Sequence, residues 1–251
     1  MKMNSTALST PFPSIHHNLI IIVGGYGSGK SEISVNLARQ LAAGRSSPVA
    51  LADLDIVNPY FRSREAAEKL ATFGVRSLVP PGTQVYADLP VVIPDIKREI
   101  ANRSGRLILD VGGDDVGARV LSSLTEAILP LSYDMLFVVN ERRPFTSDVA
   151  GAMKVMKEIE ASSRLRFTGL IANTHLMTET TAEIVLAGIE MARHLSAKTG
   201  LAISFASVEK SVLSRMTREQ IGLPLLELDR ALVKPWEHVG NTWTDKKLRI
   251  H

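Results

Sequence analysis

Short apolar runs alternate along this chain with segments in which apolar residues recur every three or four positions. Most of the runs are four to six residues long, and they are apolar at consecutive positions rather than at every second one. This pattern is typical of strands that a parallel sheet buries on both faces. It predicts strands at Leu19–Val23, Val49–Asp53, Val75–Val79, Arg106–Asp110, Met135–Val139, Phe167–Ala172 and Ala202–Ala206.

Between these runs lie segments with the apolar stripe of an amphipathic helix. They predict helices at Ser31–Ala43, Ser147–Ser162 and Thr180–Thr199. Thr180 and Glu183 stand at the spacing of a capping box, which marks a helix start. Repeated alternation of strand and helix predicts an α/β fold with a doubly wound, mainly parallel sheet and helices on both faces, in a single domain.

The chain of 251 residues has the length of one such domain. We expect residues 1–18 to form a flexible lead-in, residues 19–234 the folded domain and residues 235–251 a polar tail. Residues 80–98 contain four prolines and do not match the pattern of a regular element.

A glycine-rich stretch, GGYGSGKS, follows the first predicted strand and fits the phosphate-loop (Walker A) pattern G-x-x-x-x-G-K-[ST]. Such a loop points backbone N–H groups at an anion, and the following helix adds its positive end. We predict that Lys30 reaches the β- and γ-phosphates as a catalytic residue and that the Ser31 hydroxyl ligates Mg²⁺. The predicted nucleotide-binding residues here are Gly24, Gly25, Tyr26, Gly27, Ser28, Gly29, Lys30, Ser31 and Glu32.

Three aspartates at the ends of predicted strands could serve the magnesium side of such a site. Asp110 ends its strand and is followed by Gly113 in a D-x-x-G pattern. Asp53 and Asp55 come two residues apart at the end of the second strand, so they lie on the same side. One of these two could hold the water shell of the metal, and the other could orient an attacking water or a substrate hydroxyl.

The stretches GGYGSGKS, ADLDIVNP and LILDVGG, in this order, resemble the motifs of MinD/ParA/CobQ-type nucleotide-binding domains, relatives of the nitrogenase iron protein. They resemble still more closely those of a small uncharacterised group of bacterial ATP-binding proteins. The resemblance covers about Leu19 to Ala206. It implies a P-loop NTPase domain that binds Mg-ATP, hydrolyses it slowly and often forms nucleotide-dependent dimers.

The resemblance also implies roles for single residues. Asp55 matches the aspartate that positions water, and Asp110 matches the Walker B aspartate, which leaves Asp53 beside the metal. Asn173, in GLIANTHL, lies where this class places an amide for the base, although an asparagine there could also cap a turn. That region lacks the guanine-reading sequence N-K-x-D, which favours ATP over GTP.

The phosphate loop departs from this class at Gly25. The typical loop, G-K-G-G-x-G-K-[ST], has a lysine there that reaches the ATP of a second subunit. Arg62, Arg64 or Arg142 could supply a replacing cation, or could be ordinary surface charges. A homodimer therefore stays open, and the sequence specifies neither a protein partner nor an acceptor substrate.

Composition narrows the remaining possibilities. The chain has no cysteine, so disulfides and a cysteine-held iron–sulfur cluster are excluded. A net charge of +3, spread along the chain, gives no indication of nucleic-acid binding. We find neither a signal-peptide core nor an apolar stretch long enough to span a membrane, so we expect a cytoplasmic protein.

We predict a Mg-ATP-binding P-loop protein that acts as a slow ATPase and a nucleotide-dependent switch. One alternative is an ATP-dependent small-molecule kinase or ligase, in which residues 80–98 would help to form an acceptor pocket. The other is a nucleotide-binding regulatory subunit without turnover, consistent with the missing lysine at position 25.

Overall fold

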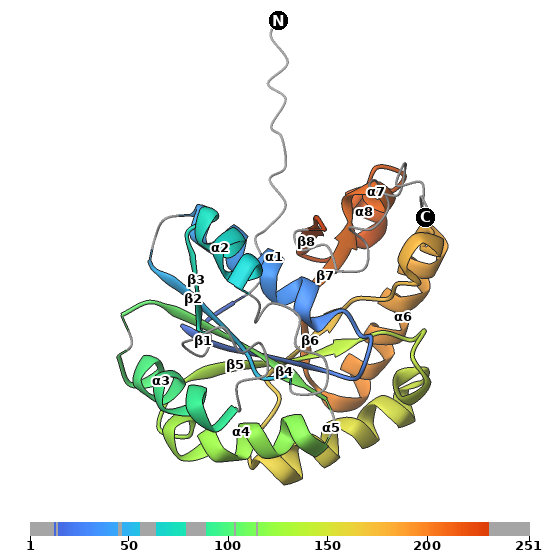
Figure 1. Cartoon of the computed structure of the whole chain (residues 1–251). Helices are drawn as coiled ribbons and strands as arrows, with labels where there is room; N and C mark the ends of the chain where they lie inside the picture. The colour runs from blue at the N-terminus through green and yellow to red at the C-terminus, as the bar shows by residue number, and fades with distance from the viewer. Residues whose placement is uncertain are drawn as a thin grey trace, which may run out of the picture.

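Eight strands of the described residues form one sheet in the order β3-β2-β4-β1-β5-β6-β7-β8, and every neighbouring pair is parallel (Figure 1). The structure, a computed structural model, describes residues 13, 15–44, 47–55, 64–78, 89–102, 104–113 and 115–230. The strands are β1 (Leu19–Gly24), β2 (Val49–Asp53), β3 (Val75–Leu78), β4 (Arg106–Gly112), β5 (Tyr133–Val139), β6 (Gly169–Ala172), β7 (Ala202–Glu209) and β8 (Leu225–Leu228).

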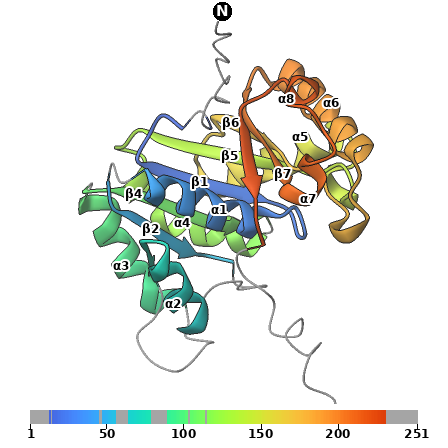
Figure 2. The ribbon, with the colours of Figure 1, turned by 90° about the horizontal axis from the view of Figure 1, so that it is seen from above.

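Helices join these strands and cover both faces of the sheet (Figures 1 and 2). The α-helices are α1 (Lys30–Ala43), α2 (Arg64–Thr72), α3 (Leu89–Asn102), α4 (Asp115–Ile128), α5 (Val149–Ser163), α6 (Ala182–Thr199), α7 (Lys210–Leu213) and α8 (Arg218–Ile221). Two short 3₁₀ helices, η1 (Pro144–Thr146) and η2 (Met177–Glu179), follow β5 and β6. The predicted doubly wound α/β fold is confirmed.

The two faces of the sheet have separate cores, because successive side chains of a strand point to opposite sides. In β1, Ile20 and Ile22 pack with α1 and α2, whereas Ile21 and Val23 pack with α3, α4 and α5. All four side chains are fully buried. This two-sided burial explains why β1 reads as a continuous apolar run and not as an alternating one.

All seven predicted strands are present, and the sheet order brings two acidic strand ends together. β4 lies between β2 and β1, and Asp53 is in register with Asp110. The carboxyl ends of parallel strands share one edge of the sheet, so both aspartates lie at the edge from which the loop after β1 emerges.

The prediction for residues 80–98 was wrong in its second half, where α3 begins at Leu89. Pro94 lies inside this helix, and it removes one backbone donor. Ile93, Ile96 and Ile100 recur at helical spacing and pack into the core, which compensates for the lost hydrogen bond. Residues 79–88 lie outside the described part of the chain.

Three smaller differences also emerge. The N-cap of α6 is Thr181, whose hydroxyl accepts a hydrogen bond from Ile184 N, so the capping box predicted from Thr180 was wrong. Arg64, which we considered as a replacing cation, is the first residue of α2, a helix that was not predicted. β8, a strand of four residues, was not predicted.

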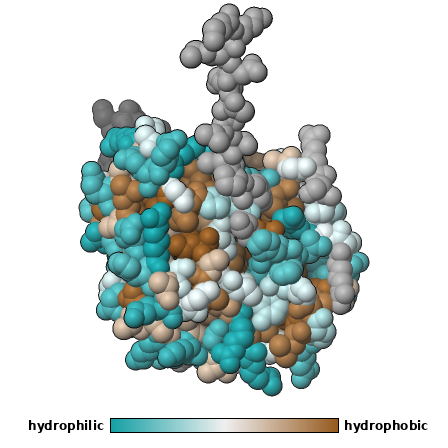
Figure 3. Space-filling view, turned by 180° about the vertical axis from the view of Figure 1, so that it is seen from behind, coloured by the Kyte–Doolittle hydropathy of each residue, from teal (hydrophilic) through white to brown (hydrophobic). Residues whose placement is uncertain are grey.

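Both predicted chain ends lie mostly outside the described residues. The last part of the predicted lead-in is anchored, because the backbone N–H groups of His16 and His17 donate to Asp134 Oδ2 at 2.8 and 2.7 Å. No helix in the described ranges is long and apolar enough to cross a membrane. Seen from behind, hydrophobic residues form separate groups among hydrophilic ones (Figure 3).

Candidate functional site

The loop between β1 and α1 has the backbone shape that an anion cradle needs. Ser28 N donates to Gly25 O at 3.0 Å, which turns the chain back before the helix. Gly27 and Gly29 have φ angles of 71° and 90°, in the left-handed region that favours glycine. Lys30 then begins α1, so the positive end of this helix faces the loop.

Close backbone packing joins this loop to the end of β4. A Cβ atom built on Gly113 would lie 2.5 Å from the carbonyl carbon of Gly24 and 2.7 Å from Gly25 N. No side chain fits in that space. The glycine of the D-x-x-G pattern therefore allows the residues after Asp110 to contact the phosphate loop directly.

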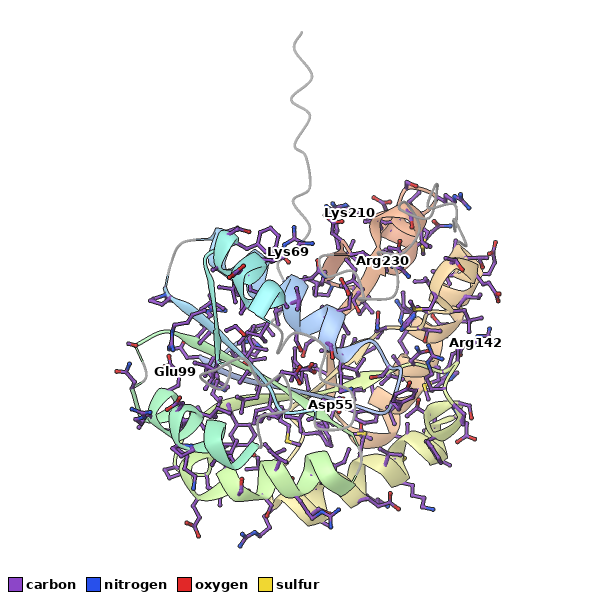
Figure 4. All side chains as sticks on the ribbon, in the orientation of Figure 1. Asp55, Lys69, Glu99, Arg142, Lys210 and Arg230 are labelled. Carbon is purple, nitrogen blue, oxygen red and sulfur yellow. The ribbon has the colours of Figure 1, made fainter. Side chains whose placement is uncertain are left out.

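The predicted lysine and aspartates meet on the side of the loop toward the carboxyl ends of β2 and β4, which we call the inner side. Lys30 Nζ lies 2.7 Å from Asp55 Oδ2, and both side chains are buried. Asp55 N donates to Asp53 Oδ1 at 3.0 Å, and Leu54 N donates to Asp110 O at 2.8 Å. We call Asp53, Asp55 and Asp110 the acidic cluster. Figure 4 shows Asp55 near the middle of the ribbon, below α1.

Burial and mutual repulsion shift the charges of this cluster. Burial raises the pKa of Asp110 to about 7; the negative charge of Asp53 adds to this, and the positive charge of Lys30 opposes it. Burial lowers the pKa of Lys30, but the charges of Asp110, Asp55 and Asp53 outweigh that effect and raise it. Lys30 therefore carries its charge at neutral pH, whereas burial favours the protonated form of Asp110.

Asp110 stands out within the cluster because both of its carboxylate oxygens are buried without a hydrogen bond of ordinary geometry. The nearby Ser31 hydroxyl lowers the pKa of this aspartate, so the two side chains lie close together. Buried polar atoms usually have partners, and exceptions often mark a place for an ion or water.

We call the side of the loop toward the carboxyl ends of β6 and β7 the outer side. There the amide of Asn173 binds the backbone of the loop. Asn173 Nδ2 donates to Ser28 O at 2.7 Å, and Ser207 Oγ donates to Asn173 Oδ1 at 2.8 Å. Both ends of the amide are thus engaged. The predicted contact between Asn173 and a base stays a prediction, and Ser207 is a neighbour that the sequence did not indicate.

Two further residues on the outer side, Arg143 and His175, were not predicted from the sequence. Arg143 Nε donates to Gly27 O at 2.7 Å. Burial, together with the positive charge of Arg143, lowers the pKa of His175 to about 4. His175 is therefore neutral at pH 7. These residues follow β5 and β6, and only the sheet order brings them to the phosphate loop.

A cavity of about 340 Å³ opens on this outer side. This volume lies within the range of about 300–1,000 Å³ typical of small-molecule sites. Its walls come from the phosphate loop, from the residues after β6 and from the ends of β7 and β8, and they include Tyr26, Asn173, His175, Glu209 and Leu228. Lys30 and Ser31 line it as well, whereas no member of the acidic cluster does, so Lys30 lies between the cavity and the cluster.

Comparisons with known proteins support the fold. FtsY from Mycoplasma mycoides matches with a TM-score of 0.51 and 16% identity, over 79% of this chain and 62% of that chain. The cell division protein FtsY from Thermotoga maritima matches with a TM-score of 0.50 and 20% identity, over 80% of this chain and 66% of that chain. The chain has the fold of a P-loop NTPase.

These comparisons support the P-loop NTPase fold and no narrower family. The chain spans about two thirds or less of the length of either FtsY chain. A nucleotide-binding protein from Archaeoglobus fulgidus, in complex with ADP, has a TM-score of 0.48 at 16% identity, over 78% of this chain and 84% of that chain. No protein-family model and no curated protein matches the sequence. The comparisons thus do not single out the MinD/ParA group.

Gly25 stands where the MinD/ParA/CobQ-type loop has a lysine, and the space around it is open. A Cβ atom on Gly25 would meet nothing within 4 Å. Of the three arginines considered as replacements, Arg142 pairs with Glu141 at 3.3 Å and lies far from Asp55 in Figure 4. Arg62 lies outside the described residues, and the side chain of Arg64 is not described.

Two other predicted P-loop residues lie at the cavity. Tyr26 is 78% exposed, and Glu32 lies in the first turn of α1. The Glu32 carboxylate accepts a hydrogen bond from Asn36 Nδ2 at 3.0 Å. Both residues line the cavity wall, and their contacts with a nucleotide stay predictions.

The P-loop NTPase fold implies Mg²⁺, and the residues present fit it. Within the described part of the chain, no group of three or more histidine or acidic side chains could hold a metal by itself. Mg²⁺ usually keeps several waters and binds one or two protein oxygens together with substrate phosphates. Asp110, whose two carboxylate oxygens lack partners, suits such a site together with the nearby Ser31 hydroxyl, with Asp53 alongside.

Proposed function

We propose that this protein binds Mg-ATP at the phosphate loop and hydrolyses it slowly, as a nucleotide-dependent switch. The observation that carries the proposal is the buried ion pair between Lys30 and Asp55, 2.7 Å long. This pair joins the lysine that would bind the phosphates to the aspartate that would position the attacking water.

The ion pair couples phosphate binding to the acidic cluster. Phosphates bridged by the Lys30 ammonium draw on its charge and on its three N–H donors, which weakens its short contact with a carboxylate. Asp55 would then lose this contact with Lys30 and would accept a hydrogen bond from water.

Mg²⁺ would supply charge neutralisation at the β- and γ-phosphates when it is bound. Ser31 would ligate it, and Asp110 and Asp53 would hold its waters. Asp110 must lose its proton for this role, and a cation close by lowers the pKa of a carboxylate. ATP is favoured over GTP because Leu176 stands where N-K-x-D would have its aspartate.

A nucleotide binder without turnover is the second candidate, and Gly25 favours it. No side chain at this position can reach the γ-phosphate of a second copy. A homodimer would need another cation to complete hydrolysis. The two candidates share the same binding site and differ only in the rate of phosphate release.

Isothermal titration calorimetry of the full chain with ATP, ADP and GTP, with and without Mg²⁺, tests the proposal. We expect one nucleotide per chain, tighter binding of ATP with Mg²⁺, and weaker binding of GTP. A parallel phosphate-release assay separates the two candidates. Absence of nucleotide binding under all these conditions would overturn the proposal, and binding without any phosphate release would select the second candidate.

A further inference from the structure

Arg143, between β5 and η1, reaches the outer side of the phosphate loop. Its Nε atom donates to Gly27 O at 2.7 Å. A Cβ atom on Gly27 would lie 3.0 Å from Nε and 3.1 Å from Cζ, so the guanidinium lies against the α-carbon of this glycine. Asn140 O accepts hydrogen bonds from Arg143 N at 3.2 Å and from Thr146 Oγ1 at 2.7 Å. Both the backbone and the side chain of Arg143 are therefore fixed.

The position of Arg143 relative to the loop identifies the part of the nucleotide that it can meet. Arg143 lines the 340 Å³ cavity together with His175, Ser207 and Glu209. The cavity runs from the phosphate loop, where Lys30 and Ser31 line it, to the residues after β6 and β7, and the acidic cluster does not line it. Arg143 thus faces the nucleoside end of a nucleotide whose phosphates occupy the loop.

Within the described part of the chain, the charge of Arg143 is not neutralised by a neighbouring acid. Among the described residues, no carboxylate pairs with its guanidinium, whereas the adjacent Arg142 pairs with Glu141. With Nε bonded to Gly27, the two terminal amino groups remain for other contacts. A flat cation at the wall of a nucleoside-sized cavity is suited to stack on an aromatic base.

We propose that Arg143 is a nucleoside-recognition residue whose guanidinium packs on the face of the bound base. This inference rests on the proposed function. Arg143 could instead only hold the loop through Gly27, or attract phosphates through its charge. Either of these roles would affect the binding of pyrophosphate, which has no base, as much as the binding of ADP.

Calorimetric titration of the full chain with ADP and with pyrophosphate tests this inference. The variants are Arg143→Ala, Arg143→Lys and the control Arg166→Ala. Arg166 is exposed, pairs with Glu160 at 2.7 Å and precedes β6 at the opposite edge of the sheet. Lysine keeps the charge and a donor for Gly27 O but lacks the plane that stacks on a base.

We expect Arg143→Ala to weaken ADP binding about five-fold, as the loss of a moderate cation–π contact would. Arg143→Lys should weaken ADP binding to a similar degree. Pyrophosphate binding should change less than about two-fold in both variants, because the stacking contact involves only the base. Arg166→Ala should bind both ligands as the wild type does.

Two results would overturn the inference while leaving the proposed function intact. One is an equal loss of ADP and pyrophosphate binding in Arg143→Ala; the other is wild-type ADP binding in Arg143→Lys. If Arg143→Ala does not fold, the lysine variant decides alone. A wild-type chain that binds neither ligand would instead remove the proposed function itself, and this inference with it.

Discussion

The two sides of the phosphate loop hold it by different means. On the inner side, charges dominate: Lys30 forms a buried ion pair with Asp55, beside an Asp110 whose pKa burial raises to about 7. On the outer side, hydrogen bonds to backbone carbonyls dominate, from Asn173 to Ser28 and from Arg143 to Gly27.

This difference indicates how each side responds to a ligand. The inner side is a set of charges that must rearrange when phosphates and Mg²⁺ arrive. The outer side already has its backbone contacts in place, so it can keep its shape while a nucleoside enters the cavity. The inner side should therefore control turnover, and the outer side should mainly control affinity.

The largest expected effect is on the inner side. Lys30→Ala should weaken ATP binding by more than about 100-fold and abolish phosphate release, because it leaves buried carboxylates uncompensated and removes the phosphate contact. Titration calorimetry and a phosphate-release assay measure both effects. Lys210→Ala, at an exposed lysine paired with Asp229, is the control. Unchanged binding and rate in Lys30→Ala would contradict the site assignment.

Asp55→Asn separates turnover from affinity. We expect phosphate release to fall about 100-fold, since a positioned base typically contributes about 10²–10⁴-fold. ATP affinity should stay the same or increase, because Lys30 no longer has to leave a carboxylate. Both quantities are measured on the same preparation. Normal turnover would remove Asp55 from catalysis.

On the outer side, Asn173→Ala should weaken all nucleotides alike, by about 10-fold, because it removes the hydrogen bond that orients Ser28. The ratio of the variant's Kd to the wild-type Kd should be the same for ATP and for ADP. Ser207→Ala removes only the bond to Asn173 Oδ1 and should give a smaller loss. An Asn173→Ala defect confined to ATP would show that the outer side also senses the γ-phosphate.

The raised pKa of Asp110 predicts a pH dependence of the apo protein. From its ordinary value of 3.8, a raised folded-state pKa means that the native state binds the proton more tightly than the unfolded chain. The stability from this group is therefore complete below about pH 4 and is lost as the pH rises through about 7.

Urea unfolding of wild type and Asp110→Asn between pH 5 and 8 measures this effect. As the pH rises, the wild-type free energy of unfolding should fall, relative to that of the variant, by up to about 1.4 kcal/mol per pH unit. Glu158→Gln, at an exposed glutamate, should run parallel to the wild type. Parallel curves for Asp110→Asn as well would show that Asp110 titrates normally.

The smallest expected effect is on stability at the open loop position. Gly25→Lys should change the free energy of unfolding by less than about 0.5 kcal/mol, because its side chain meets nothing nearby. Gly29→Ala is the contrasting variant and should be strongly destabilising, since φ is 90° and its Cβ would lie 2.3 Å from Asn173 Nδ2. Faster phosphate release in Gly25→Lys would show that the missing lysine limits turnover.

The two sides also differ in how far the sequence predicts them. The phosphate loop is contiguous, and buried strands end at Asp53 and Asp110, so one motif and one apolar pattern locate the inner side. Arg143 and His175 come from separate segments that only the order β1-β5-β6 brings to the loop. Nothing in their local sequence indicates that contact.

Two elements, α3 and β8, were not predicted because their local sequence lacks a clear pattern. Prolines dominate residues 80–98, and they obscured the apolar spacing of Ile93, Ile96 and Ile100 that forms α3. Asp229, directly after β8, is held to α1 by two hydrogen bonds with Asn36. Such a contact between distant residues leaves no periodic pattern in the sequence.

A crystal structure with a non-hydrolysable ATP analogue and Mg²⁺ tests the central claim most directly, through the distance from Lys30 Nζ to Asp55 Oδ2. We predict that this distance grows well beyond its present 2.7 Å, as Lys30 moves onto the β- and γ-phosphates and the base enters the cavity beside Arg143. An analogue bound at the loop with the Lys30–Asp55 pair intact, or bound elsewhere, would contradict this account.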